Sequence, residues 1–132
     1  MNVPFVSFLP LEQELDQELR AAFERVYSRS WYINGQEDST FEKAFAAFCG
    51  TEYCVGTGNG LDALMLALKT LGVHEGDEVI VPSNTYIATA LAVTYVGAKV
   101  VLVEPDIRTF NIDPSKIEAA VTDKTKAVMP VR

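Results

Sequence analysis

Three glycines fall within the five residues Gly56–Gly60, directly before an apolar pattern of helical spacing. Glycine lets the backbone turn tightly, so the segment can expose amide N–H groups at the N-terminus of the following helix. The helix dipole favours an anion at that end, and a phosphate group would fit there. A tight strand-to-helix turn without a ligand explains the same pattern equally well.

Two common nucleotide-binding motifs fail to match this segment. The dinucleotide-binding pattern G-x-G-x-x-G needs a third glycine at the position of Leu61. A P-loop needs Gly-Lys-Ser or Gly-Lys-Thr, whereas this helix opens with Gly60-Leu61-Asp62. A nucleotide-binding enzyme of another α/β type is therefore a disfavoured hypothesis.

A second segment, Gly76–Tyr86, brings an aromatic residue to the same region. A short apolar strand ends at Pro82, and polar residues then lead to Tyr86 at the start of a helix. Ligands of open α/β sheets collect at the carboxyl ends of the strands, where both segments are expected to lie. A ring beside a phosphate site suits a flat heteroaromatic cofactor, because stacking adds about 0.5–1.5 kcal/mol beyond burial. Taken alone, a tyrosine at such a position more often packs in the core or on the surface than stacks on a ligand.

The elements that must position these residues alternate between helices and short apolar runs, which is typical of an α/β fold with a mainly parallel sheet. Helices are expected at residues 11–26, 39–50, 61–68 and 85–96 and from Pro114 onward, and strands at 53–55, 78–81, 99–103 and 126–131. Ser39 and Glu42 have the spacing of a capping box, and Asp113 is expected to cap the last helix. We divide the chain into an N-terminal helical segment, residues 1–50, and the first part of a large α/β domain, residues 51–132.

Composition disfavours several classes of function. The net charge of −7, from 18 acidic and 11 basic residues, argues against a nucleic-acid partner. Cys49 and Cys54 match no zinc or redox motif, so we expect two buried apolar residues, no metal site and a reducing cytoplasmic location. The longest apolar run, Ile87–Ala98, is too short to span a membrane, and no secretory signal is expected in residues 1–10.

Together the segments closely resemble the DegT/DnrJ/EryC1/StrS family of pyridoxal-phosphate-dependent sugar aminotransferases. The family's N-G-x-D-A-L, G-D-E-V-I-V-P and A-T-A-x-A-V motifs match residues 59–64, 76–82 and 88–93. Further similarity covers residues 31–35, 96–98, 111–114 and 117–120. These ordered motifs extend over almost the whole chain, so the resemblance is more specific than a single glycine loop.

The resemblance implies a three-layer α/β/α fold, part of an aspartate-aminotransferase-like large domain preceded by N-terminal helices. It implies that backbone amides of Gly58, Asn59 and Gly60 hold the phosphate of pyridoxal phosphate, with the Asn59 side chain as a further donor, and that Tyr86 stacks on the pyridine ring. The implied reaction moves an amino group from glutamate to a nucleotide-linked keto-sugar, for polysaccharide, antigen or secondary-metabolite sugars. A homodimer is also implied.

The family's Schiff-base lysine and the aspartate that partners the pyridine nitrogen lie beyond the strand that here ends at Val131. We therefore expect no catalytic residue in this chain and no turnover by it alone. Arg132 also stands where the family tends to have histidine. The alternative hypothesis is a non-catalytic remnant, or a module for dimerisation or interaction.

Overall fold

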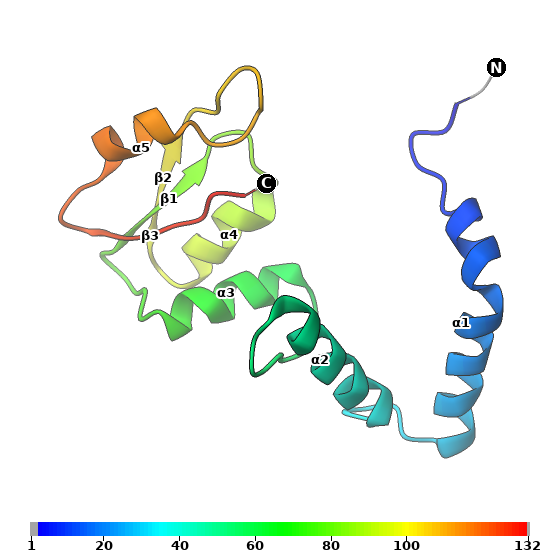
Figure 1. The fold of residues 1–132 in the computed structure, drawn as a ribbon. Helices are drawn as coiled ribbons and strands as arrows, with labels where there is room; N and C mark the ends of the chain where they lie inside the picture. The colour runs from blue at the N-terminus through cyan, green and yellow to red at the C-terminus, as the bar shows by residue number, and fades with distance from the viewer. Residues whose placement is uncertain (1–2, 132) are drawn as a thin grey trace. The chain divides into compact units, whose positions relative to one another are not determined.

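The computed structural model describes residues 3–131, which form two compact units that meet in sequence at Gly56 and Thr57 (Figure 1). The helices are α1 (Leu9–Arg29), α2 (Gln36–Cys49), α3 (Gly60–Thr70), α4 (Ile87–Tyr95) and α5 (Pro114–Ala120). The strands are β1 (Glu78–Pro82), β2 (Lys99–Val103) and β3 (Thr125–Val128). The division into domains at residues 50 and 51 stays a prediction.

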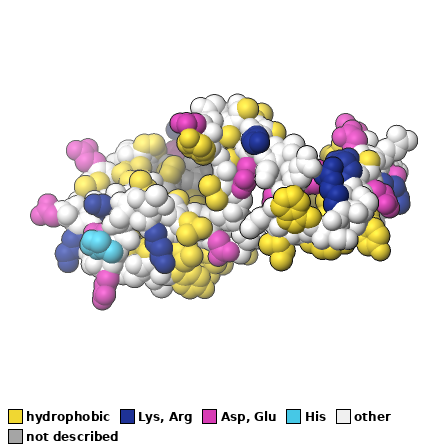
Figure 2. All heavy atoms as spheres, turned by 90° about the horizontal axis from the view of Figure 1, so that it is seen from below, with side chains coloured by type: hydrophobic (Ala, Val, Ile, Leu, Met, Phe, Trp, Pro, Cys, Tyr) yellow, Lys and Arg dark blue, Asp and Glu magenta, His cyan; other side chains and the backbone are white. Residues whose placement is uncertain are grey.

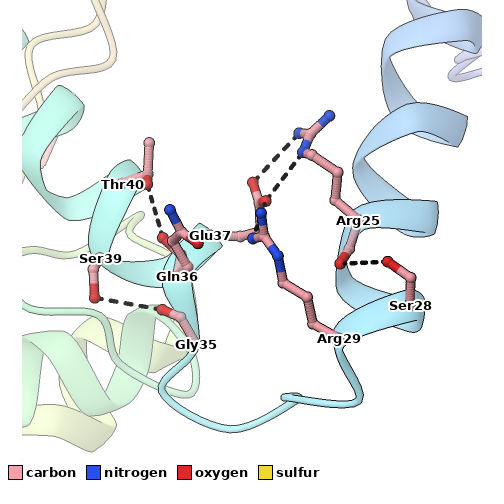
Figure 3. A network of polar contacts seen from close by, with 8 residues as sticks. All are labelled: Arg25, Ser28, Arg29, Gly35, Gln36, Glu37, Ser39 and Thr40. Carbon is pink, nitrogen blue, oxygen red and sulfur yellow. Dashed lines mark hydrogen bonds and ion pairs between the residues drawn. The ribbon is translucent and has the colours of Figure 1, made fainter.

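The first unit contains α1 and α2, linked by one cluster of charges. Glu37 at the start of α2 accepts a 3.1 Å hydrogen bond from Nε of Arg25, and Arg29 Nη1 lies 3.6 Å from the same oxygen (Figure 3). Both arginines lie on the last turns of α1. The ion pairs are exposed, so they orient the two helices but add little stability.

The predicted capping box at the start of α2 is wrong. The helix begins at Gln36, after Gly35 as the N-cap, and Ser39 Oγ donates to the Gly35 carbonyl from within the first turn (Figure 3). Glu42 Oε1 instead accepts a 2.7 Å hydrogen bond from the Gly56 amide. A longer-range partner thus outcompetes the local cap.

The second unit is built on a parallel sheet in the order β2-β1-β3. Each strand of this sheet agrees with a predicted one to within a few residues, and β1 is buried along its whole length. Alternate β1 residues face opposite ways: Val79 and Val81 pack with residues of α3 and α4, whereas Ile80 packs with residues of β2 and α5. Helices therefore cover both faces, which confirms the three-layer α/β/α architecture.

The predicted strand at residues 53–55 is wrong. Tyr53 and Val55 are mostly exposed and pair with no strand among residues 3–131. A short apolar run forms a strand only where a neighbouring strand supplies backbone hydrogen bonds. The two cysteines also depart from expectation: Cys49 is exposed and Cys54 half-buried, because the first unit has so little core to bury them in.

Candidate functional site

A groove of about 730 Å³ lies between the N-terminal parts of α3 and α4 in the second unit. Its lining comes from one run of residues on each helix: Asn59, Gly60, Leu61, Ala63, Leu64, Tyr86, Ile87, Ala88, Thr89 and Leu91. The structure thus brings Asn59, Gly60 and Tyr86 together from distant positions in the sequence. Gly58, the fourth predicted site residue, precedes the helix and does not line the groove.

The side chain of Asn59 caps α3. Its Oδ1 accepts a 2.9 Å hydrogen bond from the Asp62 amide, and its Nδ2 donates a 2.9 Å hydrogen bond to Asp62 Oδ2. Asn59 itself is extended, with φ −166° and ψ 173°, as an N-cap residue should be. The cap engages Oδ1 and one N–H of Nδ2, so within residues 3–131 the second N–H of Nδ2 remains a donor beside the backbone amides.

The amides of Gly58, Asn59, Gly60 and Leu61 remain free at this helix end within residues 3–131. The amides of Asp62 and Ala63, in contrast, are paired with Asn59. A Cβ added to Gly60 would meet no atom within 4 Å, so open space adjoins its backbone. Free amides, the helix dipole and space together fit a phosphate group.

Tyr86 precedes the first residue of α4 and is 80% exposed. Its carbonyl accepts a 3.0 Å hydrogen bond from the Thr89 amide, and Thr85 and Thr89 share a 2.7 Å bond between their hydroxyl groups. The backbone at Tyr86 is therefore fixed while the ring remains free on the groove. Such a ring offers a stacking surface for a flat ligand.

The charges near the groove are sparse. Asp62 is half-buried beside the free amides, and a Cβ on Gly58 would lie 3.1 Å from its Oδ2. None of the chain's six lysines is among the groove's lining residues. Within residues 3–131 no group of three or more His, Cys, Asp or Glu side chains could hold a metal ion, and no helix is long and apolar enough to cross a membrane.

Sequence reasoning missed the apolar lining of the groove and the role of Asp62. Leu64 and Leu91 have the spacing of core positions, and nothing local distinguishes a leucine that lines a groove from one that is fully buried. The role of Asp62 could have been predicted from the sequence. An acidic residue three positions after an N-cap asparagine is well placed to hydrogen-bond back to it and complete the cap.

The fold belongs to a known class of enzyme. The Streptomyces venezuelae protein DesV superposes with a TM-score of 0.92 at 47% identity, over 97% of this chain and 34% of DesV. NtdA from Bacillus subtilis, solved with bound cofactor PMP, superposes with a TM-score of 0.85 at 33% identity, over 98% of this chain and 31% of NtdA. The second unit is thus part of the aminotransferase fold.

The family model of the DegT/DnrJ/EryC1/StrS aminotransferases matches residues 13–132, and the chain belongs to this family. A dTDP-3-amino-3,6-dideoxy-alpha-D-galactopyranose transaminase of Aneurinibacillus thermoaerophilus is 50% identical over 129 residues, which are 98% of this chain and 36% of that relative. The chain spans about a third of the length of the relatives it matches. Pyridoxal phosphate is the cofactor of the family.

Proposed function

We propose that this chain is the N-terminal, cofactor-binding portion of an aminotransferase that moves an amino group from glutamate to the keto carbon of a nucleotide-linked sugar. The product would enter polysaccharide, antigen or secondary-metabolite synthesis. One observation carries the proposal: free amides at Gly60 and Leu61 and the exposed ring of Tyr86 line a single groove. The 50% identity to a transaminase named for a dTDP-linked amino sugar supports the substrate class.

The residues present fit the cofactor in two places. The backbone amides of Gly58, Asn59 and Gly60 would bind its phosphate, with the Leu61 amide as a further donor, and the Asn59 side chain would also hold the helix end in shape through Asp62. Tyr86 would lie against the pyridine ring and keep water from that face. When bound, pyridoxal phosphate supplies the electron sink on which amino transfer depends. The glutamate donor, the homodimer and a cytoplasmic location are parts of the same proposal.

A second candidate function, a non-catalytic dimerisation or interaction module, has its own support. Phe41, Phe45 and Phe48 form a row along α2: the rings of Phe41 and Phe45 stack with centroids 5.5 Å apart, and that of Phe48 is tilted against Phe45 at 6.1 Å. Their exposed fractions are 59, 45 and 86%. A row of exposed aromatic rings on one helix is typical of a surface that another chain or segment covers.

Titration of the chain with pyridoxal phosphate and with pyridoxal separates the two candidates. The cofactor-binding hypothesis expects tighter binding of the phosphorylated form, because only it can use the free amides. Equal affinity for the two ligands would contradict the phosphate site. Failure to bind either ligand, together with self-association that is lost in Phe45→Ser, would favour the interaction module.

A further inference from the structure

The loop that carries Tyr86 is tied to a second loop by one side chain. Between β1 and α4 the chain makes a turn in which the Thr85 amide donates to the Pro82 carbonyl, at 3.2 Å. Asn84 lies in this turn, and its Nδ2 donates a 2.9 Å hydrogen bond to the carbonyl of Phe110. Phe110 is 26 residues away, in the loop between β2 and α5.

The acceptor of this bond is held firmly. Asp106 Oδ1 accepts from the amides of Arg108 and Thr109, at 2.9 and 3.1 Å, and the Asp106 amide donates to the Asn111 carbonyl. The Phe110 amide in turn donates to the Asp106 carbonyl, at 2.8 Å. These bonds close the loop on itself and point the Phe110 carbonyl at Asn84.

Phe110 also has a strained backbone. Its φ of +58° lies in the left-handed region, which a residue with a Cβ adopts at a cost. Such a conformation persists only where the surroundings impose it, and it clusters at functional sites. The bond from Asn84 reaches this residue from outside its own loop.

We propose that Asn84 is a positioning residue for the groove: it braces the turn that presents Tyr86 against the loop 104–113. The turn has a backbone tie to β2, since the Ser83 amide donates to the Val103 carbonyl, but that tie lies before Asn84. After it, the fixed points are the bond from the Thr85 amide to the Pro82 carbonyl, within the turn, and the α4 contacts of Thr85 and Tyr86 with Thr89. Between these two sets of contacts, the Asn84 side chain connects the turn to the loop 104–113. Its effect on a ligand rests on the proposed cofactor site.

The test compares Asn84→Ala and Asn84→Asp, which both remove the donor, with Asn111→Ala. Asn111 is a matched control, because it is an exposed asparagine in the partner loop whose side chain makes no hydrogen bond within residues 3–131. Backbone hydrogen exchange without any ligand is measured at residues 83–87 and 106–111. Binding of pyridoxal phosphate and of pyridoxal is then titrated, and the urea midpoint reports whether each variant folds as the wild type does.

We expect both Asn84 variants to exchange faster in both loops, with exchange in β1 unchanged and the urea midpoint lowered by no more than the loss of one hydrogen bond. The two ligands should lose affinity by the same factor, roughly two- to tenfold for one hydrogen bond, because the ring contact shifts and the phosphate contact does not. The control should match the wild type. Asn84→Asp keeps the size of the side chain and removes the donor. An effect shared by both variants therefore does not come from the space that alanine leaves empty.

Three results would overturn the inference: exchange that changes in neither loop, exchange that rises throughout the unit, or unchanged affinity for both ligands in a wild-type-like fold. A wild-type chain that binds neither ligand would overturn the proposed function instead. The exchange data would then still decide whether Asn84 braces the two loops.

Discussion

Lys99 Nζ donates a 2.8 Å hydrogen bond to Oε1 of Glu78 and so joins the first residue of β2 to the first residue of β1. The other oxygen of this buried carboxylate accepts a 2.7 Å bond from Thr122 Oγ1, just before β3. One carboxylate thus links the first residues of β1 and β2 to the segment that leads into β3, at the edge opposite the groove. The bonds from Lys99 and Thr122 lower the pKa of Glu78 below its ordinary value of 4.5.

The first prediction concerns pH. Because the pKa of Glu78 is lower in the folded state than in the unfolded chain, its contribution to stability is fully present above about pH 4.5 and is lost as the pH falls through the folded-state value. Glu78→Gln should flatten that part of the stability curve. Urea midpoints between pH 3 and 7 would show it; Glu75→Gln, at an exposed carboxylate nearby, serves as the control. Identical curves for wild type and Glu78→Gln would contradict this role.

The second prediction concerns the cap of α3. Asn59→Ala removes the acceptor for the Asp62 amide and should lower the free energy of unfolding by about 0.5–2 kcal/mol. Asn59→Gly should lower the free energy of unfolding by only a few tenths of a kcal/mol, since glycine is itself tolerated at an N-cap. Equilibrium urea unfolding measures both. Equal losses for the two variants would mean that packing, not capping, is what Asn59 provides.

The third prediction distinguishes the phosphate site at Gly60 from the stacking surface at Tyr86. Gly60→Val should place a branched side chain in the open space beside the free amides and abolish the preference for pyridoxal phosphate over pyridoxal. Tyr86→Ala should lower the affinity for both ligands about equally. The expected factor is roughly two to ten, which corresponds to a loss of about 0.5–1.5 kcal/mol of stacking. Gly60→Ala is the matched control with the smallest added group. A Gly60→Val chain that keeps the preference would place the phosphate elsewhere.

The fourth prediction is that the chain forms no specific Schiff base with pyridoxal phosphate and transfers no amino group. A lysine that does this work must reach the cofactor and have a depressed pKa. Lys99 is engaged by Glu78 at the far edge of the sheet, and Lys116 lies 3.3 Å from Asp113. Borohydride reduction followed by peptide mapping should find no stoichiometrically labelled lysine. A single labelled site together with transfer from glutamate to a keto-sugar nucleotide would refute this.

The fifth prediction is that the chain self-associates. Hydrophobic side chains, yellow in Figure 2, reach the surface at many positions. Phe48 and Leu102, for example, are both largely exposed. β2 and β3 each pair on one side only among residues 3–131, and unpaired strand edges recruit further chains. Light scattering across a dilution series should show particles larger than a monomer that bind a hydrophobic dye. A monomer at every concentration, without dye binding, would count against it.

The parts of the structure that sequence reasoning predicted are those set by local chemistry. Val79–Val81 is a short apolar run bounded by a turn and a proline, and it is the buried central strand. Asp113 before Pro114 was expected to cap α5, and its Oδ1 accepts from the Ser115 amide at 3.0 Å. In both cases the residues that decide the structure lie within a few positions of each other.

The parts that were missed depend on partners far away in the chain. Glu42 was assigned to a local cap, but its carboxylate meets the Gly56 amide 14 residues later. Glu78 was assigned only to the start of a strand, because its partners Lys99 and Thr122 lie 21 and 44 residues away. Sequence reasoning expects Gly60 and Tyr86 at one edge of the sheet, but the apolar walls of the groove beside them depend on how α3 and α4 pack, which no local spacing reveals.

The position of β1 between two parallel neighbours sets an order of assembly. Its pairing with β2 closes a short β-α-β crossover, whereas β3 is made later and must dock on the opposite side of β1. Pairings that are distant in sequence are slow, because the chain must lose more entropy before the contact forms. During synthesis one side of β1 is therefore unpaired until β3 has emerged. We expect the nascent chain to be exposed to misassembly during this interval, because an unpaired strand edge can pair with another chain.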